Sequence, residues 1–449
     1  MKLLRLSAIF HLSAALIITF TLTTSAHAQT ESVLYIFSGT EDGRYPASTI
    51  ALDTAGNVYG TTSSGGLSTC LGIGCGVVFE LSPSSSGWTY TQVHTYLGGV
   101  DGAQPLAGVI LDSAGNLYAT TGLGGNDHDC PVLGPGCGTV DEFSPSTNGA
   151  WTEKTLAEFN GPGTGWYPLD SLVADARGNL YGTTEYGGSS DFCNGENGGC
   201  GIVFELSPNS SGGWTETVLH VFHSYAGGAG GYVPFSGVVL DAAGNLYGTT
   251  FKGGSSIHCN GFGCGVVYKL SPNSDGTWTE TVLHTFTEGL DGGVPVAGVA
   301  FDSKGNLYGA ASVGGNPTAC NPPGCGTIYQ MSPKANGAWS FHVIHTFTGG
   351  DGAGPWGTPL IDGKGNLYGT TVVGGDLTCN SGNGCGTVFK MSPSTSGWQL
   401  TTLHAFTNSP DGAEPTASVT LDASGNLFGT TTDGGLNTSC CGTVFEIKP

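Results

Sequence analysis

Short runs of apolar and β-branched residues recur along the chain, separated by stretches rich in Gly, Asn, Asp and Pro. In one copy the runs are SGVVLD (236–241), NLYGTT (245–250), GVVYKLSP (265–272) and WTETVLHTF (278–286). Runs of this length and composition, bounded by turn-forming residues, predict β-strands. No stretch has convincing helical periodicity. We therefore predict an all-β protein.

The four predicted strands, named A to D in chain order, belong to a repeat. The segment LDTAGNVYGTT, which begins at Leu52, returns six more times at intervals of about sixty residues. In every copy a proline precedes the turn aspartate by seven residues, and this aspartate precedes the turn glycine by three. Repetition with such a period is typical of a propeller, a solenoid or an array of beads.

The two ends of the repeat array distinguish a closed ring from an open stack. Residues 31–39 resemble strand D alone, whereas residues 418–449 contain strands A, B and C without D. Pairing the first strand into the last sheet closes a ring and removes its exposed edges. We predict a single seven-bladed β-propeller over residues 29–449, with four-stranded blades, strand A innermost and strand D outermost.

Residues 1–28 have the features of a secretory signal peptide. Lys2 and Arg5 precede an apolar run, and Ala26-His27-Ala28 provides a small-x-small cleavage pattern. No second hydrophobic segment follows, which disfavours a membrane anchor. We expect an exported, secreted or periplasmic protein whose mature chain begins near Gln29.

The charge excludes two classes of partner. The chain has 12 Lys and Arg against 34 Asp and Glu, a formal net charge of −22. Nucleic acids and anionic membrane surfaces require clusters of basic residues, and no such cluster is present. We expect neither nucleic-acid binding nor membrane insertion, and a monomer kept in solution by its charge.

The 14 cysteines fall into one pair per repeat, always in the B–C loop. The pairs are Cys70/Cys75, Cys130/Cys137, Cys193/Cys200, Cys259/Cys264, Cys320/Cys325, Cys379/Cys385 and Cys440/Cys441. Two thiolates per loop are too few for zinc, and only two loops add a histidine, His128 or His258. Because an even count in an exported chain indicates disulfides, we predict local bridges, with cross-blade pairing and zinc as alternatives.

The vicinal pair Cys440-Cys441 differs from the other six pairs. Its loop is the shortest, so we interpret it as a shortened version of the same bridge. A ligand-contacting or redox-sensitive disulfide is the alternative.

The strand order places the D–A and B–C loops on one face of the propeller, where the B–C loops vary in length. Variable loops on a rigid scaffold are common binding sites. The D–A loops also carry aromatic residues beside the fixed proline, and flat rings can stack on sugars. The candidate ligand-binding residues are Arg44, Tyr45, Trp166, Tyr167, Asp170, Tyr232 and Trp356. The alternative is that these rings only cover blade junctions.

Recurring polar residues have mainly structural interpretations. His94, His220, His284, His345 and His404 occupy one position of strand D and cannot converge on one substrate. The Asp-Gly pairs of the D–A loops predict turns, with calcium contacts as the alternative. Catalysis would need residues that break the repeat, such as Asp170, or Asp141 where other copies have Phe or Tyr. Neither has an evident partner, and we expect no catalytic residue, cofactor or metal.

The motif GNLYGTT…GG…CGTVFELSP resembles the tandem repeat of the Gloeo-Verruco (GloVer) family of secreted bacterial proteins. The resemblance covers essentially the whole chain after the signal peptide. It implies an exported repeat protein and brings no catalytic residue.

These observations favour a non-catalytic binding or scaffold module that presents disulfide-bonded loops to a glycan, a cell-surface polymer or a protein. Two alternatives remain. One is a secreted polysaccharide hydrolase or lyase with acidic residues on the loop face, and the other is a structural surface protein.

Overall fold

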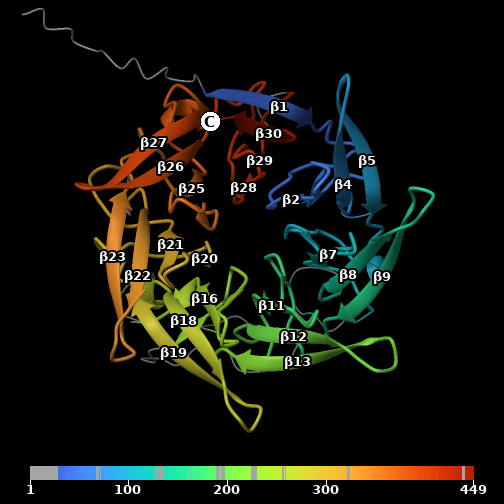
Figure 1. Ribbon diagram of the computed structural model, residues 1–449, viewed down its shortest axis with the longest axis horizontal. Helices are drawn as coiled ribbons and strands as arrows, with labels where there is room; N and C mark the ends of the chain where they lie inside the picture. The colour runs from blue at the N-terminus through green and yellow to red at the C-terminus, as the bar shows by residue number, and fades with distance from the viewer. Residues whose placement is uncertain are drawn as a thin grey trace, which may run out of the picture.

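Seven β-sheets are arranged as a ring, as the view down the short axis in Figure 1 shows. The computed structural model describes residues 29–66, 70, 72–126, 130, 136–161, 163–188, 193, 198–223, 230–254, 257, 259–320, 324–436 and 440–448. The predicted signal peptide, His128 and His258 lie outside the described residues. We number the sheets as blades 1 to 7 in the order of their inner strands.

Each blade contains four antiparallel strands. The inner strands are β2 (Ala51–Leu52), β6 (Ile110–Leu111), β10 (Val173–Ala174), β15 (Val239–Leu240), β20 (Val299–Phe301), β24 (Leu360–Ile361) and β28 (Thr420–Leu421). The second strands are β3 (Val58–Thr62), β7 (Leu117–Thr121), β11 (Leu180–Thr184), β16 (Leu246–Thr250), β21 (Leu307–Ala311), β25 (Leu367–Thr371) and β29 (Leu427–Thr431).

The outer half of each blade is longer. The third strands are β4 (Val77–Ser84), β8 (Thr139–Pro145), β12 (Ile202–Pro208), β18 (Val266–Pro272), β22 (Thr327–Pro333), β26 (Thr387–Ser394) and β30 (Thr443–Lys448). The outermost strands are β5 (Gly87–Thr95), β9 (Trp151–Glu158), β13 (Trp214–Val221), β19 (Trp278–Thr285), β23 (Trp339–Thr346), β27 (Gly397–Ala405) and β1 (Thr30–Ile36).

Short elements lie in the loops. A two-stranded pair joins β14 (Gly231–Tyr232) to β17 (Lys252–Gly253). Three 3₁₀ turns, η1 (Gly99–Asp101), η2 (Cys259–Gly261) and η3 (Asn380–Gly382), complete the described elements.

The ring closes as the sequence predicted. Strand β1 is the outermost strand of blade 7 and pairs with β30 in the order β1-β30-β29-β28. Figure 1 shows this blue strand beside the red C-terminal strand. Phe37, directly after β1, is fully buried among residues of blades 7 and 1. The chain therefore forms a closed seven-bladed propeller.

The turn between the first two strands of a blade explains the D-x-x-G-N-x-Y pattern. Asp241 accepts hydrogen bonds at Oδ1 from the backbone N–H groups of Ala243 and Asn245, both at 2.9 Å. Its Oδ2 accepts from Asn245 Nδ2 at 2.7 Å and from the Tyr247 hydroxyl at 3.0 Å. Gly244 has φ 80°, a conformation that favours glycine. The aspartate is a turn-forming residue.

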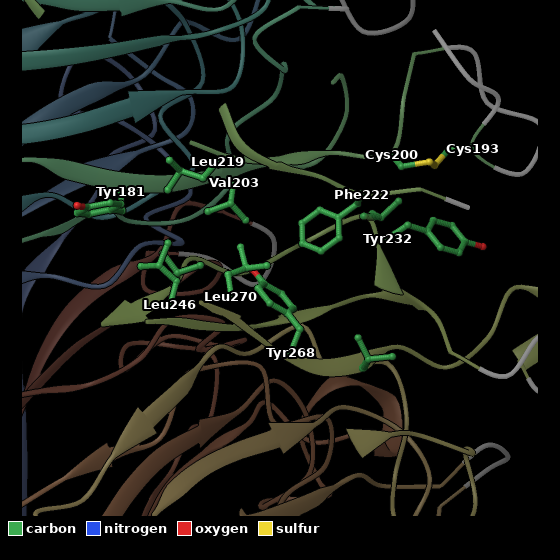
Figure 2. Close-up of a cluster of buried hydrophobic side chains, with 13 residues drawn as sticks. Tyr181, Cys193, Cys200, Val203, Leu219, Phe222, Tyr232, Leu246, Tyr268 and Leu270 are labelled. Atoms are coloured by element: carbon green, nitrogen blue, oxygen red, sulfur yellow. A yellow bond between two sulfur atoms is a disulfide. The ribbon is translucent and has the colours of Figure 1, made fainter. Parts of the chain in front are cut away.

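The hydrophobic core lies between neighbouring blades. Figure 2 shows the cluster between blades 3 and 4, in which Val203 from β12 faces Tyr268 and Leu270 from β18. Leu219 and Phe222, from and just after β13, fill the same space. Since every blade buries one face against each neighbour, the ring is held together all around by apolar packing.

The fixed proline has a role at every blade junction. Pro295 packs on Gly265, where an added Cβ would lie 2.7 Å from the proline Cδ and 2.2 Å from the Thr250 carbonyl oxygen. Beside it, the Val294 N–H donates to the carbonyl of Cys264 at 2.8 Å. Equivalent Gly–Pro contacts occur at Gly76/Pro105, Gly138/Pro168, Gly201/Pro234, Gly326/Pro355, Gly386/Pro415 and Gly442/Pro46.

The inner strands are shorter than predicted. The sequence suggests a strand over 236–241, but only Val239–Leu240 pair with β16. The preceding residues contact the neighbouring blade instead, because the Ser236 carbonyl accepts from Thr183 Oγ1 at 2.9 Å and Gly237 N–H donates to Asp170 at 2.7 Å. This segment lines the inside of the ring.

Candidate functional site

The D–A loops are held by the repeated histidine and aspartate residues. Nε2 of His345 lies 2.9 Å from Asp351 Oδ2, and Oδ1 of Asp351 accepts from the Thr348 N–H at 2.8 Å. The same pairing joins His94 to Asp101, His284 to Asp291 and His404 to Asp411. These residues therefore have a structural role, because they connect the outer strands to the D–A loops.

All seven predicted disulfides are present, one in each B–C loop. Gly98, in the D–A loop that joins blades 1 and 2, lies against Cys70 and Cys75, since an added Cβ would come 2.9 Å and 3.5 Å from their sulfur atoms. This disulfide therefore packs against the neighbouring D–A loop. Disulfides in this number are typical of an oxidising compartment.

The pairing of the cysteines is as predicted, but the bridges do not form part of the surface that the loops present. The second cysteine of every pair is buried and at most 1% exposed: Cys75, Cys137, Cys200, Cys264, Cys325, Cys385 and Cys441. Three of the first cysteines are buried as well, namely Cys130, Cys193 and Cys379. These residues are therefore structural, as the prediction of local bridges implied.

The burial of the second cysteine follows from its position at the blade junction. It directly precedes the glycine that touches the proline of the next blade, and its carbonyl accepts a hydrogen bond from the residue before that proline. The donors to Cys137, Cys200, Cys325 and Cys385 are the N–H groups of Tyr167, Val233, Gly354 and Glu414, at 3.0, 2.8, 2.9 and 2.9 Å respectively. Each bridge therefore anchors its B–C loop in the junction.

The vicinal Cys440–Cys441 bridge occupies the same place in blade 7. It packs on Gly39, where an added Cβ would lie 2.4 Å from the Cys441 sulfur. Cys441 is 1% exposed, and its carbonyl accepts the Tyr45 N–H at 3.1 Å. Its surroundings support the interpretation as a shortened structural bridge at the ring closure.

A central pocket opens among the D–A loops on the face that carries the disulfides. Its volume is about 540 Å³. All seven residues that directly follow the fixed prolines surround it with apolar side chains or methyl groups: Ala47, Leu106, Leu169, Phe235, Val296, Trp356 and Thr416. A cavity of this size is in the range of small-molecule sites, roughly 300–1,000 Å³.

Side-chain direction in the D–A loops depends on position relative to the proline. The residue directly before the proline has a left-handed conformation in every blade, for example φ 59° at Tyr45 and φ 57° at Glu414. Both of these side chains line the central pocket. The residue two positions before the proline instead faces the B–C loop of its own blade, as Trp166 and Tyr232 do.

Two predicted binding residues are therefore buried, and their expected exposure was wrong. Trp166 is 2% exposed, stacks on Tyr186 at a centroid distance of 4.5 Å, and donates from Nε1 to the Gly198 carbonyl at 3.1 Å. Tyr232 is 4% exposed and donates its hydroxyl to the Phe262 carbonyl at 2.9 Å. Both rings shape the loops.

Arg44 and Tyr167 also lie outside the lining of the pocket. The Arg44 guanidinium lies 4.3 Å from the centre of the Tyr45 ring and donates from Nη2 to the Tyr45 hydroxyl. Tyr167 is half-buried at the junction of blades 2 and 3, where an added Cβ at Gly122 would lie 3.0 Å from its ring. Of the seven candidates, the pocket brings together Tyr45, Asp170 and Trp356.

Asp170 bridges two blades at the wall of the pocket. Its Oδ1 accepts from the Ser171 N–H and its Oδ2 from the Gly237 N–H, both at 2.7 Å. Burial raises the pKa of Asp170, although these two backbone hydrogen bonds oppose the rise. The carboxyl group is thus positioned rigidly, with one further lone pair on each oxygen.

Glu414 is the charged pocket residue that was absent from the predicted binding residues. It lies directly before Pro415, at the position that places Tyr45 in the pocket. Burial, followed by the nearby charge of Asp433, raises the pKa of Glu414. The signal was available in the repeat, since Glu414 is the only charged residue among the seven positions that precede the fixed prolines.

The pocket combines apolar side chains with hydroxyl groups and acids. Its polar side chains are Tyr45, Ser48, Thr49, Ser63, Asp170, Thr358, Glu414, Thr416, Ser418 and Thr432. No Lys, Arg or His is among its described lining residues. This surface suits a neutral or cationic ligand with many hydroxyl groups.

Asp141 does not belong to this pocket. It is fully buried between blades 1 and 2, where it accepts hydrogen bonds from Thr139 Oγ1 at 2.6 Å and the Tyr96 hydroxyl at 3.4 Å. Burial raises the pKa of Asp141 to about 7. At the other junctions this pair is replaced by two aromatic rings, for example Phe37 and Phe79 at 5.2 Å.

Two groups in the described part of the chain have ligand atoms close enough for a metal, and neither contributes to the pocket. The first consists of Cys259, Cys264 and Glu288, but its cysteines form a disulfide. In the second, His94 places Nε2 3.3 Å from Asp101 and Nδ1 3.5 Å from Glu153. Because the acids contact opposite nitrogens of the ring, this arrangement is that of an ion-pair network.

No helix in the described ranges is long and apolar enough to cross a bilayer.

Comparisons with known proteins complete this description. No curated protein sequence matches the chain. Among solved structures, a luciferin-regenerating enzyme is similar over 94% of this chain and 95% of its own, with 12% identity and a TM-score of 0.36. The family model described as Gloeobacter/Verrucomicrobia repeat matches residues 18–192 and 257–449. The chain therefore belongs to the Gloeobacter/Verrucomicrobia repeat family.

Proposed function

We propose that this protein is an exported, non-catalytic binding module that holds part of a glycan in the central pocket. The observation that carries the proposal is the distribution of exposed apolar side chains. Nine large apolar residues of the described chain are exposed, and all lie in B–C or D–A loops: Ile73, Leu97, Val100, Ile257, Phe262, Leu290, Trp356, Leu377 and Leu436. Concentration of apolar surface on one face is typical of an interaction site.

Trp356 supports a glycan in particular. It is 40% exposed and lines the central pocket together with Tyr45 and several hydroxyl groups. Sugars present apolar C–H faces that stack on indole rings and hydroxyl groups that exchange hydrogen bonds with acids and alcohols. Because the pocket lies at the centre of the loop face, it suits the end of a glycan chain or a short segment better than the flat surface of a long polymer.

The test is depletion of the protein from solution by a panel of insoluble neutral, amino and acidic polysaccharides. We expect depletion by at least one polymer, and loss of this depletion in Trp356→Ala. The matched control is Phe262→Ala, because Phe262 is 42% exposed on the same face but lies outside the pocket. No depletion by any polymer, or equal loss in both variants, would overturn the proposal.

A second candidate is a polysaccharide hydrolase or lyase. The observation that favours it is the presence of two carboxyl groups with raised pKa, those of Asp170 and Glu414, in one pocket. Both Asp170 oxygens already accept backbone hydrogen bonds, which suits positioning better than proton transfer. Release of reducing ends or unsaturated products from the bound polymer, lost in Asp170→Asn and Glu414→Gln, would establish the enzyme instead.

A further inference from the structure

The acids of the central pocket have no basic partner within its described lining. Glu414 is half-buried, and its carboxylate forms no hydrogen bond with the described part of the chain. Asp170 is bound only by backbone N–H groups. Withdrawal of a carboxylate from water without a cation nearby is unfavourable, as the raised pKa of both groups reflects. The pocket is therefore complementary to positive charge.

The basic residue next to Tyr45 in sequence, Arg44, is engaged elsewhere. Arg44 stacks on Tyr45. Burial raises the pKa of Asp433, and the charge of Arg44 opposes this rise. Arg44 is also absent from the described lining of the pocket. It leaves the charge of Glu414 uncompensated.

The neighbours of Glu414 around the ring are aromatic. Trp356 belongs to blade 6, Glu414 to blade 7 and Tyr45 to blade 1, so these three pocket residues come from consecutive blades. An ammonium group is attracted both to a carboxylate and to the faces of aromatic rings. Because the Arg44 guanidinium already covers the Tyr45 ring, the exposed ring available to such a group is that of Trp356 in the blade before Glu414.

Asp170 lies in blade 3, well around the ring from blade 7, so the two acids would contact different parts of a ligand that fills the pocket. The free lone pairs of Asp170 suit hydroxyl donors, as do Thr49 and Ser418 on the same lining. A ligand with one ammonium group and several hydroxyl groups fits both ends of the pocket.

We infer that the ligand of the central pocket is a glycan with unacetylated amino sugars, whose ammonium group is held by Glu414 on the side of Trp356. This inference rests on the proposed function and specifies its ligand. It requires that binding depends on the positive charge of the sugar and on the negative charge of Glu414.

The experiment measures the dissociation constants of three soluble trisaccharides by calorimetry, at near-neutral pH and low ionic strength. The probes are the trimer of glucosamine, the trimer of N-acetylglucosamine and the trimer of glucose. We expect the glucosamine trimer to bind at least about tenfold more tightly than the other two, the range for one charge-assisted hydrogen bond. Glu414→Gln should remove this preference without lowering the thermal midpoint.

The control variant is Asp275→Asn, which removes an exposed charge from a C–D turn on the opposite face. If the preference survives in Glu414→Gln, it does not depend on this carboxylate, and the inference is overturned. If the preference falls equally in the control, it reflects only the net charge of the protein, and the inference is overturned as well. If all three trimers bind equally and Trp356→Ala abolishes binding, the inference fails while the proposed function stands. If no trimer binds, or binding survives in Trp356→Ala, both fail.

Discussion

At the scale of single residues, departures from the repeat have two different explanations. Tyr96 and Asp141 replace a pair of aromatic rings as a unit, and their hydrogen bond joins them across a blade junction. Trp356 and Glu414 have no such compensating partner within the described chain, and both face the central pocket. A residue that breaks the repeat and is not compensated inside the protein is the better candidate for a ligand contact.

Asp141 should make the protein less stable as the pH rises. Its pKa is about 7 in the folded protein because of burial, whereas the unfolded value is near 3.8. Between these values the unfolded chain loses its proton first, so the free energy of unfolding falls from about pH 4 to pH 7. Asp141→Asn should reduce this fall in the thermal midpoint, measured by calorimetry across that range.

The control for this measurement is Glu41→Gln, which removes an exposed acid. Its pH profile should keep the slope of the unsubstituted protein. An unchanged slope in Asp141→Asn would contradict the assignment. A slope that remains has sources in Glu216 and Glu153, whose pKa values burial also raises to about 7.

At the scale of elements, the junction between blades depends on a close approach of backbone to proline. The glycine after each second cysteine lies against the end of the second strand of its own blade and against the proline of the next blade. The same junction includes the hydrogen bond from the residue before the proline to the carbonyl of that cysteine. The Cys-Gly pair of one repeat therefore contacts the fixed proline of the next repeat.

Gly265→Ala should lower the thermal midpoint strongly. The added Cβ would lie 2.2 Å from the Thr250 carbonyl oxygen, and the backbone has φ 91°. Gly276→Ala is the matched control, because Gly276 has φ 85° but no atom within 4 Å of the added Cβ. The left-handed conformation alone costs about 1–2 kcal/mol. Equal losses in the two variants, measured by thermal unfolding, would show that the junction contact contributes nothing.

At the scale of the whole molecule, stability depends on closure of the ring. Strand β1 covers the edge of β30, and Phe37 fills the junction of blades 7 and 1. Without them the last blade would expose a strand edge and an apolar surface. The first and last segments of the chain therefore act together.

Removal of residues 29–40 should lower the thermal midpoint markedly and promote association between molecules. A peptide of residues 29–40 added in trans should restore part of the midpoint. The same peptide with Phe37→Asp should not, since Phe37 is 0% exposed in the intact protein. No change on removal, measured by thermal unfolding and sedimentation, would contradict a stabilising closure.

The repeat by itself determined the blade number, the closure of the ring, the turn chemistry and the disulfide pairs. Each of these features depends on residues close in sequence or on a pattern present in every copy. For example, Asp241 and Tyr247 are six residues apart and form one turn. Such local constraints are visible in a single sequence.

Only the tertiary structure decided which loop residues reach the central pocket. Trp166 lies two positions before a fixed proline and Tyr45 one position before the equivalent proline, yet one side chain is buried against a B–C loop and the other lines the pocket. The difference is set by the left-handed backbone before the proline and by contacts between blades whose residues are about sixty positions apart. Side-chain direction at such a turn follows from packing between repeats, which residue type alone does not specify.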